Sequence, residues 1–220
     1  QYKPRKGDFA PSLDRLAHLT ELAARNAELV VLPEMAATGY LFPCPDTAGA
    51  VAEPARGQTF RRLSPIAAAH GAWIVAGFPE ADGDALFNSA LVIDPAGELA
   101  FTYRKTLLFE ADTPWARPGD SGYRAFDADG GRFGVGICMD LNDDAFVAWA
   151  ASADLRAIAF PTNWLDEGSD IWPYWAWRVD ETNAALVAAN TYGWEEETLF
   201  HGRSCVLDRR VIRAASGPTG

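Results

Sequence analysis

Apolar runs and amphipathic segments alternate along the chain and predict an α/β protein. The segment that begins at Ser12 carries leucines at helical spacing, with Ser12 in the position of a helix cap. The apolar run 29–32 that follows is typical of a strand buried on both faces of a sheet. The order then recurs, with a helix over 60–70 that ends at Gly71 and a strand over 73–78. This repetition indicates a layered fold.

The pattern continues through the rest of the chain. A hairpin is expected over 88–104, because two apolar runs flank the turn sequence Asp-Pro-Ala-Gly. The later elements are expected at strand 132–137, helix 143–151, strand 155–160, helix 172–183 and strand 185–190. No Gly/Ser linker or internal repeat divides the sequence, so we expect one domain over residues 1–220. The chain is also expected to lack a first strand before Gln1 and a tail after Gly220.

Composition and charge exclude several classes of function. The chain is 49% hydrophobic and 22% charged, which is ordinary for a globular protein. No apolar run approaches the roughly 20 residues that span a bilayer, so no membrane partner is expected. The net charge of -11, without a block of basic residues, argues against nucleic acid. Cys44, Cys138 and Cys205 lack metal-ligand spacing and suit a reducing compartment, so we expect a cytoplasmic protein without a metal.

One of these cysteines has an unusual local context. Cys138 follows the predicted strand 132–137 and precedes the helix-starting residues of "LNDD", so it is expected on a strand-to-helix turn. The free N–H groups and partial positive charge of a helix N-terminus would favour a thiolate there. The alternative is a buried structural cysteine, because free cysteine is among the most buried residue types.

Two further reactive residues also follow predicted strands. Glu34 comes after the run 29–32, and Lys105 comes after the second strand of the hairpin. Ligand and catalytic residues of α/β sheets gather beyond the carboxyl ends of the strands. Each of these residues alone could be structural, but a carboxylate, an ammonium and a thiol at strand ends together predict one constellation.

These residues lie in segments that resemble a known superfamily. "LVVLPEMAATGY" (29–40), "YRKTLLF" (103–109) and "GVGICMD" (134–140) are similar, in order and spacing, to the three signature segments of the nitrilase, or carbon–nitrogen hydrolase, superfamily. Further similar segments are 87–99, 161–164, 178–181, 187–190 and 201–208. The resemblance implies a four-layer αββα sandwich, a Glu34–Lys105–Cys138 catalytic triad, no cofactor, and a homodimer or larger homo-oligomer.

The chemistry of such a triad can be stated from its functional groups. A Cys138 thiolate attacks a carbonyl or nitrile carbon, and Glu34 moves the protons. Lys105 and the backbone N–H of Met139 stabilise the oxyanion. The expected reaction is hydrolysis of a non-peptide carbon–nitrogen bond, an amide before a nitrile, through a thioester with release of ammonia. Nitrilase and N-carbamoyl amine hydrolase activities fit the same triad and stay open.

The sequence departs from the superfamily pattern at two positions. Asp112 stands where many members carry a second glutamate, and Leu107 stands where many carry a histidine. Asp112 with Trp115 resembles the branch of protein N-terminal amidases, so Asp112 is expected to orient Lys105 or to contact the substrate.

The same branch suggests partners for a substrate. A peptide that begins with Asn or Gln brings an α-ammonium, for which Asp112, Asp140, Glu195 and the tryptophans are candidate partners. Trp164 follows "PTN" and is expected to face the site, whereas Trp172, Trp175, Trp177 and Trp194 are expected to pack in the core or at an interface.

Two other functions compete with this hypothesis. A Cys–His hydrolase would use Cys138 with His201, but it leaves Glu34 and Lys105 unexplained. A non-catalytic binding module on the same fold would not need all three reactive residues. Elsewhere in the chain, Arg178 and Glu181 are spaced for an i, i+3 ion pair.

Overall fold

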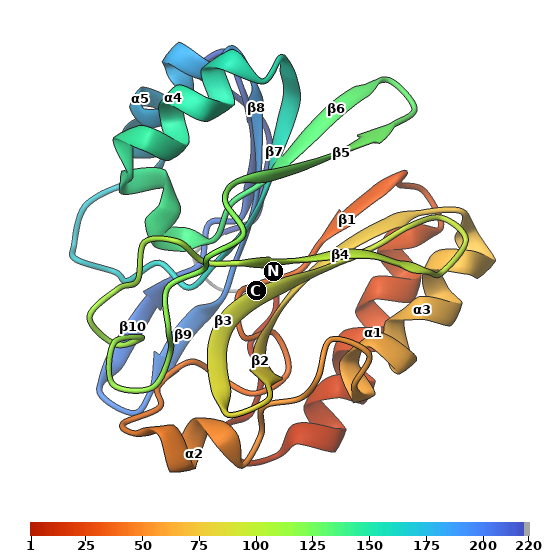
Figure 1. Ribbon diagram of the computed structural model, residues 1–220. Helices are drawn as coiled ribbons and strands as arrows, with labels where there is room; N and C mark the ends of the chain where they lie inside the picture. Colours follow the sequence, from red (N-terminus) through yellow and green to blue (C-terminus); the bar gives the residue numbers. More distant parts are fainter. Residues whose placement is uncertain (218–220) are drawn as a thin grey trace.

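The computed structural model describes residues 1–217 and has four layers. Helices α1 and α3 cover one sheet, and helices α4 and α5 cover the other, so that the two sheets face each other in the middle (Figure 1). This is the four-layer αββα sandwich that the resemblance implies. Among residues 1–217, no helix is long and apolar enough to cross a membrane.

The first sheet has the strand order β1-β2-β3-β4. Its elements are α1 (Phe9–Ala24), β1 (Leu29–Val31), α2 (Pro45–Gly49), α3 (Gln58–His70), β2 (Trp73–Asp82), β3 (Ala85–Ile93) and β4 (Leu99–Arg104). β1 pairs with β2 in parallel, and the other pairs are antiparallel. α1 and α3 pack their apolar faces on the outer side of this sheet, in a core that includes Leu16, Leu63 and Ile74.

The second sheet has the order β12-β11-β8-β7-β6-β5, and its β6, β7 and β8 are parallel. Its elements are β5 (Arg124–Ala128), β6 (Gly131–Val135), η1 (Cys138–Asn142), α4 (Asp144–Ser152), β7 (Leu155–Thr162), α5 (Trp172–Val179), η2 (Asp180–Thr182), β8 (Ala185–Asn190), β11 (Cys205–Asp208) and β12 (Val211–Ala215). A separate two-stranded ribbon joins β9 (Tyr192–Glu195) to β10 (Thr198–His201).

The inner faces of the two sheets form a shared apolar core. Val75 and Tyr103 of the first sheet are fully buried against Val135 and Ala159 of the second. Cys138 belongs to the same cluster and is 8% exposed. The nucleophile candidate therefore lies at a margin of the inter-sheet core, where a thiol can reach a pocket and still be shielded from bulk water.

The first helix begins earlier than the sequence predicts. α1 starts at Phe9 with Asp8 as the preceding residue, so the expectation that Ser12 caps it is wrong. Ser12 is buried inside the helix, and its hydroxyl accepts a hydrogen bond from the backbone N–H of Arg5. The side chain therefore ties the chain entering α1 to the helix.

The predicted helix over 172–183 is shorter and ends differently. α5 stops at Val179, a 3-10 turn follows, and Asn183 then takes a left-handed conformation that ends the helical path. Arg178 does not pair with Glu181. Its guanidinium contacts Asp144 at 2.9 Å and donates to the carbonyl oxygen of Leu141, so it joins α5 to the segment after Cys138.

Candidate active site

The carboxyl end of β1 places Glu34. Beyond β1 the chain stays beside β2, because the Ala36 N–H donates to the Gly77 carbonyl at 3.0 Å and the Gly77 N–H donates to the Pro33 carbonyl. A Cβ on Gly77 would lie 2.5 Å from Glu34 Cα, so only glycine permits this approach. Glu34 is 1% exposed as a result.

Lys105 lies directly after β4 and is completely buried. Its Nζ donates to Glu34 Oε1 at 2.8 Å and to Asp112 Oδ2 at 2.6 Å. Asn88 completes a closed network, because its Nδ2 donates to Glu34 Oε1 at 2.7 Å and to Asp112 Oδ1 at 3.0 Å. The ammonium is thus held between two carboxylates, and a third side chain fixes those carboxylates in turn.

Cys138 stands on a strained turn between β6 and the 3-10 segment η1. Its φ is +44°, in the left-handed region that non-glycine residues rarely adopt. The buried carboxylate of Asp140 secures this turn by accepting from the Ile137 N–H at 2.9 Å and from the Tyr103 hydroxyl at 2.7 Å. Asp140 also accepts from the backbone N–H of Thr106 at 3.0 Å, which ties the cysteine turn to the segment after Lys105.

The end of β7 brings a fourth strand terminus to the site. The Asn163 backbone N–H donates to Glu34 Oε2 at 2.9 Å, and Asn163 Nδ2 donates to the Glu34 carbonyl at 2.9 Å. Thr162 precedes it and is fully buried. The catalytic carboxylate candidate therefore receives hydrogen bonds from Lys105, Asn88 and Asn163 together.

Burial and charge decide the protonation of the three candidates. Burial raises the pKa of the Glu34 carboxyl, and the charge of Lys105 only partly opposes it. Burial opposes the charged form of Lys105, but the negative charges of Glu34 and Asp112 outweigh it and hold its pKa well above the usual value. Burial and the charge of Glu34 raise the pKa of Cys138 to about 12, while Lys105, Thr162 and Asn163 act against that rise. The resting site therefore holds a cationic lysine and a neutral thiol.

This result corrects the expectation that the strand-to-helix turn favours a thiolate at Cys138. Cys138 does begin a short 3-10 helix, but burial of the sulfur raises the pKa of the thiol and disfavours its charged form. The thiol needs a base, and Glu34 is the carboxylate whose charge acts on it most strongly.

Cys138 opens into a pocket of about 230 Å³. Its lining is Phe109, Cys138, Met139, Asn142, Asn163, Trp164, Leu165 and Glu167. Two of the predicted substrate-binding residues, Met139 and Trp164, are in this set. Most of the lining is apolar or aromatic, with two amides and one carboxylate, which suits a small neutral or cationic group.

The three carboxylates that were candidate partners for a substrate ammonium do not line this pocket. Asp112 does not line the pocket, because its carboxylate is occupied by Lys105, Asn88 and the Phe109 N–H. Asp140 is buried against backbone, and Glu195 accepts from the backbone N–H groups of Tyr40 and Leu41. None of these three carboxylates is placed to receive a substrate ammonium. Glu167 is the pocket carboxylate that sequence reasoning missed.

The alternative dyad is not assembled. His201 Nε2 contacts the Ser169 carbonyl oxygen at 2.6 Å, and His201 is not among the residues that line the pocket of Cys138. Cys205 is buried in the core under α4 and α5, and Cys44 lies at the start of α2. Within residues 1–217, no group of three or more His, Cys, Asp or Glu side chains is placed to hold a metal ion.

Sequence reasoning also left Asn88 and Asn163 without a role. Both lie in segments that resemble the superfamily, 87–99 and 161–164, but nothing in their spacing to Glu34 shows that the two amides converge on it. Only the pairing of β2 with β3, and the approach of β7 to β1, bring them there.

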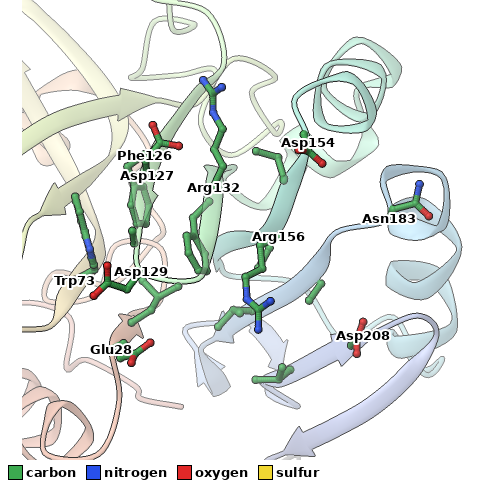
Figure 2. Close-up of a pocket in the computed structure, with 18 of the residues that line it drawn as sticks. Glu28, Trp73, Phe126, Asp127, Asp129, Arg132, Asp154, Arg156, Asn183 and Asp208 are labelled. Carbon is green, nitrogen blue, oxygen red and sulfur yellow. The ribbon is translucent and has the colours of Figure 1, made fainter.

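A larger cavity lies at the opposite ends of the strands. It has a volume of about 1400 Å³ and opens between the sheets (Figure 2). Glu28 and Trp73 mark the starts of β1 and β2 there, whereas Glu34 follows the end of β1. Arg132 and Arg156 reach toward the cavity from the second sheet. No predicted catalytic residue lines it, whereas Cys138 lines the smaller pocket.

Known proteins resemble this chain over most of its length. The profile of the carbon-nitrogen hydrolase family matches residues 1–220. A nitrilase from Pyrococcus abyssi is 34% identical over 88% of this chain and 73% of its own length. A protein N-terminal amidase from Saccharomyces cerevisiae is 26% identical over 77% of this chain and 44% of its own length.

Solved structures show the same fold. An amidase from Nesterenkonia sp. superposes with a TM-score of 0.88 at 23% identity, covering 99% of this chain and 84% of the amidase. The chain belongs to the carbon-nitrogen hydrolase family. It is accordingly an enzyme of the carbon–nitrogen hydrolase class.

Proposed function

We propose that the protein hydrolyses a primary carboxamide and releases ammonia, with Cys138 as nucleophile, Glu34 as acid and base, and Lys105 as the oxyanion partner. The observation that carries the proposal is a buried Glu34–Lys105 pair, joined at 2.8 Å, whose two charges both act on the pKa of a thiol that lines a pocket. A resting thiol with a pKa near 12 cannot attack unaided, and Glu34 supplies the missing base.

The reaction proceeds in two balanced stages. The thiol proton passes to Glu34 as the sulfur of Cys138 attacks the carbonyl carbon, and the cation of Lys105 balances the charge that develops on oxygen. Collapse breaks the C–N bond while Glu34 returns its proton to the nitrogen, so ammonia leaves and a thioester remains. Water, deprotonated by Glu34, then cleaves the S–C bond, and the sulfur regains a proton.

Relatives support this chemistry by their names. An omega-amidase from Homo sapiens is 30% identical over 65% of this chain. One solved structure of a Glu-to-Gln mutant of the Nesterenkonia amidase shows the acetamide moiety of fluoroacetamide added covalently at the active-site cysteine of that protein. From these relatives, together with the buried charges around Cys138, we infer the reaction type and the cysteine nucleophile of this protein.

A panel of substrates tests the proposal. Ammonia release is measured from short aliphatic amides, the matching nitriles, N-carbamoyl amines and an Asn-leading peptide with and without N-acetylation. We expect an amide to be turned over fastest. If a nitrile leads, the amidase assignment is wrong; if nothing in the panel releases ammonia, the whole proposal fails.

The panel also tests a narrower candidate, an N-terminal amidase. Glu167 favours it, because this carboxylate lines the pocket and can face the α-ammonium of a peptide. We expect the free Asn-leading peptide to exceed its acetylated form, and Glu167→Gln to shrink that preference. Equal turnover of both peptides would remove this candidate and leave the amidase proposal intact.

A further inference from the structure

The side chain of Asn163 has one polar atom that the protein leaves without a partner. Asn163 is 4% exposed, and its N–H and Nδ2 both donate to Glu34. Its Oδ1 is buried and receives no hydrogen bond in the described structure. A buried acceptor without a donor is unfavourable, and such atoms in native structures call for an explanation.

The orientation of this amide is fixed by chemistry. The Glu34 backbone carbonyl can only accept, so the atom of Asn163 that faces it must be the N–H₂ group. Turning the amide over would set two acceptors against each other. The lone acceptor therefore stays on the side of the amide away from the Glu34 carbonyl.

The position of Asn163 links this acceptor to the substrate. Asn163 lines the pocket of Cys138, and it contacts both the carboxylate and the carbonyl of Glu34. Glu34 is the group that protonates the departing nitrogen in the proposed reaction. The residue that carries this acceptor therefore adjoins the group that protonates the leaving nitrogen, and it also lines the pocket of Cys138.

We propose that Asn163 Oδ1 accepts an N–H of the substrate carboxamide and so selects primary amides over esters and nitriles. This inference rests on the proposed function. A primary amide nitrogen carries two N–H donors, one to face Glu34 and one to satisfy Asn163. The leaving oxygen of an ester and the nitrogen of a nitrile carry none, so they would leave the buried acceptor unpaired.

Asn88 provides a matched control inside the same network. Its Nδ2 also donates to Glu34, at 2.7 Å, and its Oδ1 is also without a partner, but Asn88 does not line the pocket. Replacing Asn88 disturbs the support of Glu34 without touching the substrate. A purely structural role for Asn163 would make the two replacements behave alike.

The experiment compares the best primary amide of the panel with the methyl ester of the same acid. Both leaving groups need a proton from Glu34, so the ratio of their kcat/KM values isolates the N–H contact. We expect Asn163→Ala to lower the amide-to-ester ratio by about tenfold, the size of one lost hydrogen bond. We expect Asn88→Ala to lower both activities and leave their ratio unchanged.

The outcomes separate the two proposals. If the wild-type protein releases no ammonia from any amide, the proposed function fails. If it does, but Asn163→Ala leaves the amide-to-ester ratio of kcat/KM unchanged, as Asn88→Ala is expected to do, only the role of Asn163 is overturned.

Where ester turnover is slow, the rate of acylation of Cys138 by each substrate is followed by intact-protein mass spectrometry, and the ratio of the two rates is compared instead. If Asn163→Ala does not fold, Asn163→Ser, whose hydroxyl can still donate to Glu34, is assayed in its place with the same expected loss.

Discussion

The carboxylate of Asp112 offers the sharpest test of the buried charge network. Asp112 Oδ2 accepts from Lys105 Nζ at 2.6 Å and from the Phe109 N–H at 3.0 Å, while Oδ1 accepts from Asn88. In Asp112→Asn, one of the two oxygens becomes an N–H₂ group. Whichever way the new amide turns, it faces a donor, so at least one buried hydrogen bond is lost.

The expected loss of stability depends on the interactions that Lys105 keeps in the variant. Removing one partner of a buried ion pair costs about 3–5 kcal/mol when the other charge is left alone. Lys105 keeps Glu34 at 2.8 Å, so the lower end applies and we expect a loss of about 3 kcal/mol. For a chain of 220 residues this corresponds to a fall in Tm of about 6–12 °C.

The same variant moves the pH dependence of activity in a defined direction. The charge of Asp112 raises the pKa of Glu34, so its removal lowers that pKa. Glu34 must be ionised to take the thiol proton, and therefore the acidic limb of the kcat/KM profile should shift to lower pH in Asp112→Asn.

Thermal unfolding by circular dichroism and the pH profile of ammonia release measure both effects. Asp84→Asn is the control, because Asp84 is an exposed carboxylate in the turn between β2 and β3. A Tm within about 2 °C of the wild type, together with an unshifted acidic limb, would refute the assignment of Asp112 as a charge partner of Lys105.

Three further predictions concern the nucleophile. Cys138→Ala should abolish ammonia release and keep the circular dichroism of the fold, and residual turnover in the purified variant would contradict a Cys138 thioester. His201→Ala should leave acylation intact, since His201 binds the Ser169 carbonyl, whereas loss of acylation would favour the Cys–His alternative. Thr162 acts to lower the pKa of Cys138, so Thr162→Val should slow iodoacetamide labelling at a fixed alkaline pH, while an equal or faster rate would argue against that effect.

Periodicity predicts the parts of the fold that packing determines strongly. Strands β1, β2, β7 and β8 are mostly apolar, and each lies within a few residues of its expected position. β6 also lies within a few residues of its expected position, although its first two residues, Gly131 and Arg132, are exposed. Strands with weak patterns were missed: β12 is exposed along its whole length, and β5, β9 and β10 are short. Their positions depend on partners distant in sequence, which no local pattern records.

The sequence likewise predicts some residues of the candidate site and not others. Strand ends and the resemblance in signature segments predict Glu34, Lys105 and Cys138, and the structure brings the first two into contact. The protonation state of the Cys138 thiol was not predictable, because the local sequence shows where a helix starts but not how deeply the sulfur is buried. The convergence of Asn88 and Asn163 on Glu34 was equally hidden, since it is a property of the sheet pairing.

The charge balance of the network explains how a buried thiol can react at all. With Lys105 cationic and with Glu34 and Asp112 as carboxylates, the cluster already carries one net negative charge beside a neutral thiol. Ionising Cys138 to bulk water would add a second negative charge in a desolvated site, and this is the cause of its high pKa. Transfer of the proton from Cys138 to Glu34 keeps the net charge constant, because a thiolate appears as a carboxylate disappears. In the proposed reaction, formation of the nucleophile is therefore coupled to protonation of the group that later protonates the leaving nitrogen, and neither step needs an exchange of charge with solvent.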